Sequence, residues 1–347
     1  MQAIYRINDQ NMDILAPWGI IKKMRCGGNR MKKIIIDCDP GHDDAVALLL
    51  ATRLRELDIL GVSVVAGNSS LRNTLQNARD ILAFADASDI PVYAGCGRPL
   101  KRDLMNQSGR KIHGENGLGG KLLEVDAPAA QEKHAVDFLA DTLCAAHEKI
   151  TLVCLGPLTN IAQAFLREPR CMAGIDRLVI MGGAVRAPGN INSAAEFNFY
   201  IDPEAAKIVV ESGCRITLVP LDVTMKAMFF EEEINELKTS ANKLAALVGE
   251  LLGFYAGTYE EELGFYACPV HDALCIAVFA DPSLVAYEQA AVKVSIEGIT
   301  AGESVADLYR TWPEKPGVEF GTEIDRERFV ELVKESLVLP RGCKKHE

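Results

Sequence analysis

Short apolar stretches alternate with longer amphipathic stretches along most of this chain. Residues 33–37 form a β-branched run that predicts a strand buried on both faces, and residues 43–57 form an apolar-rich stretch that predicts a helix. Strands that alternate with helices predict right-handed crossovers and a mainly parallel sheet. The same pattern predicts further strands at residues 59–66, 91–94, 150–155, 177–181 and 216–221, and further helices at residues 71–85, 135–147, 158–167 and 203–212.

The C-terminal third of the chain follows a different pattern. It turns helical over residues 231–257 and again after His271, and it closes with β-like segments and a helix at residues 325–337. No internal repeat, low-complexity tract or linker rich in proline and serine divides the chain after its first thirty residues. We therefore predict the α/β class: a single domain over residues 31–340 with a mainly parallel, doubly wound central sheet and additional C-terminal helices, followed by a tail at residues 341–347.

Residues 1–30 differ from the rest because they show no sustained hydrophobic period. The segment that begins at Met31, MKKIIIDCDPGHDD, has the form of a protein start, with a short basic opening before a buried strand. Residues 27–30 can be encoded by purine-rich codons that resemble a bacterial ribosome-binding site. Two interpretations stay open: residues 1–30 are a mis-annotated leader before a natural start at Met31, or they are a real but poorly ordered N-terminal arm.

The composition excludes several classes of protein. With 347 residues, of which 48% are apolar and 24% charged, the chain is too hydrophobic to be intrinsically disordered. The 37 basic and 48 acidic residues give a net charge of −11 without a long basic run, so we expect no nucleic-acid partner. No apolar stretch approaches the ~20 residues of a membrane span, so we expect no membrane partner either.

Cysteine usage indicates the cellular compartment. The 10 cysteines occur one at a time, without a CxxC pair, and several lie inside apolar runs. Reduced and mostly buried thiols fit this pattern better than a disulfide framework or a zinc site. We therefore expect a cytoplasmic protein.

Four carboxylates follow the first strand of the predicted domain, at Asp37, Asp39, Asp43 and Asp44. Alternation along the strand sends Asp37 and Asp39 to one side, and the last two aspartates open a helix. Helix capping would explain Asp43 or Asp44, but it leaves the first two carboxylates unexplained. Like charges at this density require a cation or raised pKa values, and an all-oxygen ligand set favours Ca²⁺ or Mg²⁺ over Zn²⁺. The sequence therefore predicts a metal site.

Amide side chains follow other predicted strands. Asn68 comes after the second strand, and Asn190, Glu196 and Asn198 lie in one long loop. Ligands of open α/β sheets bind beyond the carboxyl ends of the strands, where all these groups should meet. Amides donate and accept in pairs, which suits a neutral polyhydroxyl compound such as a sugar. The chain has neither a Walker loop nor a GxGxxG spacing, so no phosphate-binding signal competes.

Several longer motifs identify a family. DCDPGHDDAVA is followed in order by VVAGN, IHGENGL, GPLTNIA, MGGA, AEFN and PVHDA. With these motifs, from about Met31 to the C-terminal helix, the chain resembles nucleoside hydrolases of the inosine–uridine preferring group. The resemblance implies hydrolysis of the N-glycosidic bond of ribonucleosides, with Ca²⁺ holding both the attacking water and the ribose diol. It also implies a homotetramer or a homodimer.

The resemblance also implies a role for each matching residue. Asp39 matches the general base, and His271 matches the residue that assists departure of the base, a task suited to a histidine near neutral pH. His113 falls where the family contacts the nucleobase, in a loop that is either a lid or an ordinary solvated turn. The implied Ca²⁺ ligands are Asp37, Asp44, Asp272 and the main-chain carbonyl of Leu155, where many members have Thr. The implied ribose contacts are Asp43, Asn68, Met181, Asn190, Glu196 and Asn198.

Base preference is the least determined property. Tyr255 and Tyr259 lie one helical turn apart, at spacings before His271 where broad-specificity members carry aromatic base contacts. An aromatic pair buried in a helix face is the structural alternative. The sequence leans toward a non-specific enzyme that accepts inosine and uridine, and a pyrimidine-specific enzyme is the alternative.

Two more remote alternatives come from other functional classes. A phosphatase of the haloacid dehalogenase type also opens with a strand and DxD, but it normally has Thr or Val where this chain has Gly41. A non-catalytic protein that binds nucleosides or metal would keep the carboxylates, but it would not need His271 nearby. Each auxiliary residue has a similar structural alternative: His271 beside Asp272 could simply begin a helix.

Overall fold

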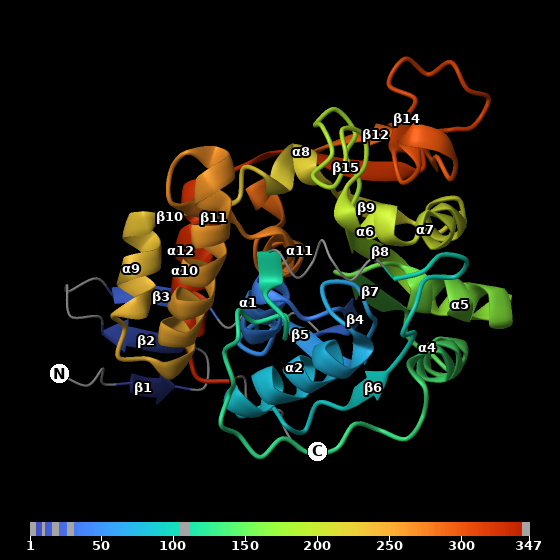
Figure 1. The fold of residues 1–347 in the computed structure, drawn as a ribbon. Helices are drawn as coiled ribbons and strands as arrows, with labels where there is room; N and C mark the ends of the chain where they lie inside the picture. The colour runs from blue at the N-terminus through green and yellow to red at the C-terminus, as the bar shows by residue number, and fades with distance from the viewer. Residues whose placement is uncertain (1–4, 9–10, 16–20, 26–30, 105–111, 342–347) are drawn as a thin grey trace. The chain divides into compact units, whose positions relative to one another are not determined.

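An eight-stranded sheet forms the centre of the computed structural model, which describes residues 5–8, 11–15, 21–25, 31–104 and 112–341 (Figure 1). Neighbouring strands of this sheet run parallel except β12 and β15, which are antiparallel. The predicted α/β class with a mainly parallel sheet is confirmed. In spatial order the strands are β12 (Val285–Ala290), β15 (Val318–Ile324), β9 (Ile216–Val219), β8 (Ile175–Met181), β7 (Ile150–Cys154), β4 (Lys32–Cys38), β5 (Leu57–Val64) and β6 (Val92–Ala94).

Helices cover both faces of the sheet, as the doubly wound prediction requires. Ile34 and Ile36 of β4 pack into one apolar core and Ile35 into the other, because successive side chains of a strand point to opposite faces. No helix in the described ranges is both long and apolar enough to cross a membrane. The first core includes α1 (His42–Ala51), α2 (Leu71–Phe84), α9 (Glu231–Lys238), α10 (Lys243–Leu263), α11 (His271–Ala280) and α12 (Arg326–Leu337), and the second includes α4 (Ala135–Cys144), α5 (Thr159–Arg167) and α7 (Pro203–Val210).

Two predicted helices have different bounds in the structure. The first, predicted over residues 43–57, ends at Ala51, because the Thr52 hydroxyl closes the last turn on the carbonyl of Leu49 and pairing with β4 draws Leu57 into β5. The predicted helix at residues 231–257 is two helices, α9 and α10. Asn242 separates them, because its side chain accepts the first main-chain N–H groups of α10.

The sheet reverses its winding between β4 and β7. From β4 the chain moves outward through β5 to β6, and it then returns to the other side of β4 as β7 (Figure 1). The connections leave these two neighbouring strands in opposite directions, so a crevice opens beyond their carboxyl ends. This crevice is where the sequence analysis expects a ligand.

Shorter elements surround the sheet. Two pairs of antiparallel strands are present: β10 (Met228–Phe230) with β11 (Ala267–Pro269), and β13 (Val292–Val294) with β14 (Ser304–Ala306). The remaining elements are the short helices α6 (Phe197–Ile201) and α8 (Leu221–Thr224) and the 3₁₀ turns Pro169–Gly174, Pro282–Leu284 and Gly298–Thr300.

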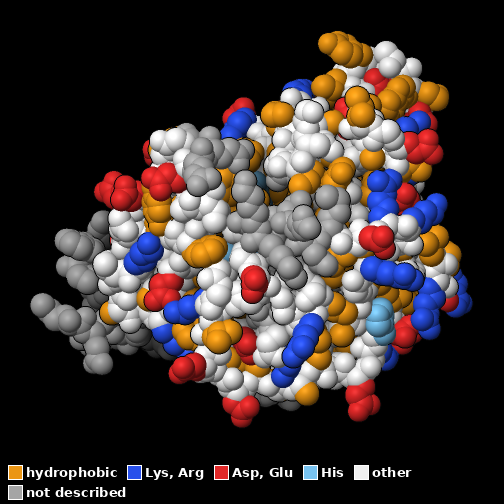
Figure 2. Space-filling model, in the orientation of Figure 1, with side chains coloured by type: hydrophobic (Ala, Val, Ile, Leu, Met, Phe, Trp, Pro, Cys, Tyr) orange, Lys and Arg blue, Asp and Glu red, His pale blue; other side chains and the backbone are white. Residues whose placement is uncertain are grey.

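Exposed apolar side chains gather around the β13–β14 pair. Ile299 and Tyr309 are 94% and 90% exposed, and Val305 and Leu308 are 38% and 39% exposed. Figure 2 shows apolar side chains over the region where Figure 1 places β14. Apolar groups gathered on a surface are typical of a contact with another molecule.

The N-terminal segment forms a unit of its own, Met1–Met31, separate from Lys32–Glu347. Within it, β1 (Tyr5–Asn8), β2 (Asn11–Leu15) and β3 (Ile21–Arg25) pair as an antiparallel sheet. The hydrophobic pattern predicts no element here, because strands this short hardly reveal a period. Whether residues 1–30 are a leader or an arm stays a prediction. The predicted tail lies outside the described residues except for Arg341.

Candidate active site

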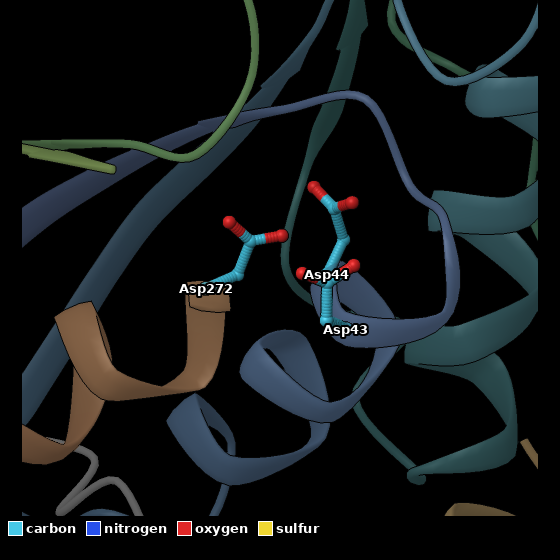
Figure 3. A group of neighbouring side chains, drawn as sticks. All are labelled: Asp43, Asp44 and Asp272. Carbon is cyan, nitrogen blue, oxygen red and sulfur yellow. The ribbon is translucent and has the colours of Figure 1, made fainter. Parts of the chain in front are cut away.

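Three buried carboxylates meet between the first turns of two helices. Asp43 and Asp44 belong to the first turn of α1, and Asp272 belongs to the first turn of α11. Carboxylate oxygens of the three residues lie within 4.8 Å of one another, and Figure 3 shows the side chains converging between the two helices. Both helix N-termini direct a partial positive charge at this point, which stabilises carboxylates.

Local hydrogen bonds explain only part of this group. Asp44 accepts the main-chain N–H groups of Gly41 at 2.9 Å and of Asp39 at 3.2 Å, so it does cap α1. It also accepts a hydrogen bond from the side-chain amide of Asn68 at 3.1 Å. Helix capping, the structural alternative to a metal site, therefore accounts for Asp44. It does not explain why Asp272 should face Asp44 from another helix.

Asp39 lies directly behind these carboxylates and is fully buried. Its Oδ2 accepts the main-chain N–H of Asn68 at 2.6 Å, while its Oδ1 has no hydrogen-bond partner among the described residues. A Cβ on Gly156 would lie 2.5 Å from that Oδ1, so the free oxygen sits beside the residue that follows Leu155. Burial raises the pKa of Asp39 well above its usual range, and the neighbouring charge of Asp44 raises it further.

Asp37 stands apart from the group of three, which differs from its predicted place among the metal ligands. Its Oδ1 accepts hydrogen bonds from the hydroxyl of Ser63 and from the amide of Asn160, the latter at 2.8 Å. Burial raises its pKa to about 7. The physical reason is position: Asp37 is still inside β4, where its side chain meets the neighbouring strand and α5, whereas Asp39 lies beyond the strand end.

The electrostatics of the group fit a hard cation. Burial raises the pKa of Asp43 to about 8, and burial followed by the charges of Asp43 and Asp44 raises that of Asp272 well above normal. Among the residues that the structure describes, no lysine or arginine pairs with these aspartates. Concentrated negative charge without a basic partner, presented by oxygen atoms alone, is the donor chemistry that Ca²⁺ or Mg²⁺ prefers.

One cavity brings the predicted ribose contacts together. Asn198 holds the far wall: its amide donates to the carbonyl of Leu155 at 2.7 Å and to that of Met181 at 3.3 Å. Glu196 caps α6 by accepting main-chain N–H groups, and burial raises its pKa to about 7. Leu155 and Asp272, two of the predicted metal ligands, line the cavity as well. All the predicted ribose contacts line it: Asp43, Asn68, Met181, Asn190, Glu196 and Asn198.

The predicted base contacts line the other end of the same cavity. His113, Tyr255 and Tyr259 are buried there, with the two tyrosine rings edge to face at 5.1 Å. The sequence analysis did not predict the apolar residues Ile112, Ile191 and Phe197, which also line the cavity. Their only signal was adjacency to His113, Asn190 and Glu196.

His271 also lines the cavity, and its acidity differs from the expectation. Its Nδ1 lies 2.8 Å from the hydroxyl of Thr224, and its Nε2 has no partner among the described residues. Burial lowers the pKa of His271 to about 4, so the ring is neutral at pH 7. The sequence analysis expected a histidine that titrates near neutral pH, because the depth of the site is not visible in the sequence.

Comparison with known sequences gives one consistent result. The sequence model described as "Inosine-uridine preferring nucleoside hydrolase" matches residues 34–331. Pyrimidine-specific ribonucleoside hydrolase RihA of Escherichia coli (strain SMS-3-5 / SECEC) is 40% identical over 306 residues, which cover 88% of this chain and 97% of that protein. The protein of the same name from Photobacterium profundum is 41% identical over 308 residues, with 88% and 98% covered.

Solved structures agree with the sequences. A plant nucleoside hydrolase, the PpNRh1 enzyme, matches with a TM-score of 0.85 and 33% identity over 89% of this chain and 99% of its own. A purine-preferring ribonucleoside hydrolase from Gardnerella vaginalis matches with a TM-score of 0.83 and 29% identity, covering 88% and 98%.

Proposed function

The chain belongs to the inosine–uridine preferring nucleoside hydrolase family, and from that membership we propose that it is a calcium-dependent hydrolase that prefers pyrimidine ribonucleosides. Membership makes it a hydrolase of N-glycosyl bonds and removes the phosphatase alternative. The observation that carries the proposal is the single cavity in which the acidic group, the ribose contacts and the base contacts meet.

The acidic end supplies the ligands for a calcium ion. We assign Asp44, Asp272 and the main-chain carbonyl of Leu155 to it, as the sequence predicts, with Asp39 in place of Asp37. Asp37 and Asp39 each have one buried carboxylate oxygen without a partner among the described residues. Position supports the exchange: Asp39 adjoins Asp44, to which its main-chain N–H donates, whereas the other oxygen of Asp37 is held by Ser63 and Asn160. A Ca²⁺ ion held by these residues would supply Lewis-acid chemistry, lowering the pKa of a water and orienting ribose hydroxyls.

The chain's own residues then position and activate the reactants. Asp39 accepts the proton of the attacking water on one carboxylate oxygen while the other would hold the ion, and the main-chain N–H of Asn68 fixes the carboxylate through Oδ2. Asp43, Glu196 and Asn198 lie along the cavity where the ribose hydroxyls would bind. Their carboxylates and amides also favour the positive charge that develops on the sugar ring as the C–N bond breaks. Direct attack of water predicts inversion at C1.

Departure of the base is assisted by a neutral His271. Its Nε2 is buried and has no partner among the described residues, so in the tautomer that carries hydrogen there it can donate a hydrogen bond to the leaving base as negative charge develops. Because the pKa of His271 is about 4, the ring is neutral at pH 7 and its assistance is this hydrogen bond, without transfer of a proton.

For base preference, our proposal differs from the sequence analysis, which favoured broad specificity. The relatives at 39% to 41% identity carry the name pyrimidine-specific ribonucleoside hydrolase, whereas the purine-preferring structure is 29% identical. Greater identity across a similar share of the chain favours the pyrimidine alternative. We therefore propose uridine and cytidine as the preferred substrates.

Release of free ribose from uridine, cytidine and inosine, with and without a chelator, tests the proposal. We expect kcat/KM for uridine and cytidine to exceed that for inosine by more than about tenfold, a difference of roughly 1.4 kcal/mol in transition-state binding. Chelation should abolish all three activities and excess Ca²⁺ should restore them. Equal kcat/KM for inosine and uridine would favour broad specificity over pyrimidine preference. Full activity in chelator would show that the enzyme does not need a metal ion.

Assembly and location remain predictions of the same kind. We propose a cytoplasmic homodimer or homotetramer, and the exposed apolar side chains around β13 and β14 support self-association. Light scattering on the purified full chain gives the mass of the assembly, and a monomeric mass would contradict this proposal.

A further inference from the structure

His42, to which the sequence motifs assign no role, contacts His113 without lining the cavity. The two rings are stacked with centroids 5.3 Å apart, and their Nδ1 atoms lie 3.1 Å apart. The main-chain N–H of His42 also points at His113 Nδ1, at 3.4 Å. Both histidines are buried, and only His113 is among the residues that line the cavity.

The main-chain amide fixes the polarity of this contact. A main-chain N–H always carries its hydrogen, so the nitrogen that it addresses, His113 Nδ1, must accept and cannot carry a proton. The proton of a neutral imidazole is then on the other nitrogen. We infer that His113 presents an Nε2–H donor to the nucleobase and that His42 is the positioning residue that fixes this tautomer.

The same reasoning sets the tautomer of His42. Because His113 Nδ1 accepts, the contact between the two Nδ1 atoms requires His42 to donate from its Nδ1. Its Nε2 is then an acceptor without a hydrogen. That atom is buried and has no hydrogen-bond partner among the described residues. A buried N–H without a partner is rarer in proteins than a buried unpaired acceptor, so the orphaned Nε2 agrees independently with the assignment.

The surrounding chain holds the His113 ring in this orientation. A Cβ on Gly41 would lie 2.7 Å from His113 Nδ1, so only glycine leaves room for the ring to approach the main chain. The main-chain N–H of Gly119 donates to the carbonyl of His113 at 2.8 Å and closes its loop. On its other side, His42 stacks on Phe254 at 5.1 Å. Burial lowers the pKa of His113 to about 3, so the ring stays neutral.

A fixed donor has a consequence for the substrate, which rests on the proposed function. Uracil and cytosine share a carbonyl acceptor, O2, next to the glycosidic nitrogen, but at C4 uracil has a carbonyl and cytosine an amine. A single N–H donor directed at O2 would therefore serve both pyrimidines, whereas one directed at C4 would reject cytosine. Oxygen O2 also gains negative charge as the C–N bond breaks, so this hydrogen bond strengthens in the transition state.

Nitrogen-15 NMR of the histidine-labelled full chain with Ca²⁺ tests the tautomers directly. We expect His113 to be the neutral Nε2–H tautomer and His42 the neutral Nδ1–H tautomer in the free protein at pH 7.5. A His113 with its proton on Nδ1 overturns the inference. The measurement requires no substrate, so its outcome is independent of the proposed function.

Two variants of His42 separate hydrogen bonding from packing. His42→Phe keeps a ring for the stack but has no donor, and we expect it to raise KM for uridine by about three- to tenfold, the factor carried by one ordinary hydrogen bond, with a smaller change in kcat. His42→Asn restores a side-chain N–H near the position of Nδ1, and its KM should return to within about threefold of wild type. Better function in His42→Phe than in His42→Asn would assign His42 to packing alone and overturn its role.

Thio-substituted substrates locate the acceptor. Sulfur accepts hydrogen bonds weakly, so 2-thiouridine should be bound less tightly than 4-thiouridine by wild type. In His113→Leu the two analogues should become similar. A greater effect of sulfur at C4 in wild type would overturn the assignment to O2. If NMR gives the expected tautomers and no nucleoside is hydrolysed, only the proposed function fails.

Discussion

The two ends of the cavity are built in opposite ways. The acidic end comes from one short segment, which contributes Asp39, Asp43 and Asp44, together with Asp272 at the start of a second helix. The base end is assembled from distant parts of the chain: His113 from the helical residues 112–113, Tyr255 and Tyr259 from α10, and His271 from α11. The first end is fixed by helix N-termini and main-chain amides, and the second by ring packing.

Burial acts on both ends with opposite electrostatic results. It raises the pKa of Asp43 to about 8 and lowers that of His113 to about 3, because burial disfavours whichever form is charged. The base end therefore reaches a stable neutral state by itself. The acidic end becomes fully ionised at neutral pH only with a cation. The difference indicates that metal and base recognition are separable properties of one cavity.

The largest expected effect breaks the acidic end. Asp39→Asn should lower kcat by up to about 10⁴-fold, because the amide cannot accept the proton of the attacking water. Calcium should still bind, more weakly, since an amide oxygen remains a ligand. Steady-state kinetics measure kcat, and titration calorimetry measures the Kd for calcium.

Asp37→Asn is the matched control for Asp39→Asn. With a pKa of about 7, Asp37 is partly protonated near neutral pH, and asparagine imitates the protonated form toward Ser63 and Asn160. We expect a loss of no more than about tenfold. Equal damage in both variants would return Asp37 to the metal site.

The next largest effect is expected from a substitution that affects the base end alone. His271→Ala should reduce kcat/KM for uridine by about 10²-fold, and it should reduce that for p-nitrophenyl riboside by less than about tenfold, because that leaving group requires no proton. Thr224→Val, which removes the partner of His271 Nδ1, should lie between wild type and His271→Ala. A uniform loss on both substrates in His271→Ala would mean that the residue acts on the sugar or the metal.

The pH dependence of folding stability distinguishes the acidic end of the cavity from the base end, and it can be measured without substrate. The folded pKa of Asp43, about 8, exceeds its unfolded value of about 4, so its stabilisation is full below pH 4 and is lost as pH rises toward 8. The folded pKa of His271, about 4, is below its unfolded value of about 6.5, so its contribution is lost only as pH falls below 6.5. Between pH 6.5 and 8 His271 should make no contribution to the slope, whereas Asp43 should contribute together with Asp37 and Glu196, whose pKa values are raised to about 7.

In that window the metal-free protein should therefore lose thermal stability as pH rises. Saturating Ca²⁺ should reduce this slope, leaving the part due to Asp37 and Glu196, and add about 2.7 kcal/mol at a hundred times its Kd. Calorimetry in chelator and in Ca²⁺ measures both quantities. In chelator, Asp272→Asn should be more stable than wild type at pH 8, and a less stable variant would show that the carboxylates do not repel one another.

The smallest expected effect is a change in base preference. Tyr259→Phe keeps the ring and removes the hydroxyl at the base end, so the ratio of kcat/KM for uridine and inosine should change by less than about tenfold, the value of one hydrogen bond. Tyr266→Phe is the control, because Tyr266 donates to Gly253 and does not line the cavity. An equal shift in both variants would indicate a general effect on the helix.

The comparison also explains what the sequence could predict. The alternation of strands and helices predicted the sheet, and the acidic motif supplied aspartates that do converge, because residues near one strand end are necessarily close in space. The motif also placed Asp37 among the implied metal ligands, but alternation tells only which side a residue faces and not how near it lies to the group of three. Sequence spacing separates His42 from His113 by 71 residues, so only tertiary structure could pair them.

The pKa of His271 is lower than the sequence led us to expect, for a related reason. A local motif shows which groups are adjacent, but the depth of burial depends on how α8, α10 and α11 close around the cavity. The break between α9 and α10 was in principle visible, since Asn242 has the character of a helix cap.

All ten residues of α1 are buried, and so are most of those of α11, at whose first turns the acidic group lies. Amide hydrogens in such helices exchange with solvent only through near-global opening, whereas the turns at residues 115–120, directly after His113, can open locally. The floor of the cavity should therefore keep its shape through each turnover, and the nucleoside and the free base should pass beside these turns.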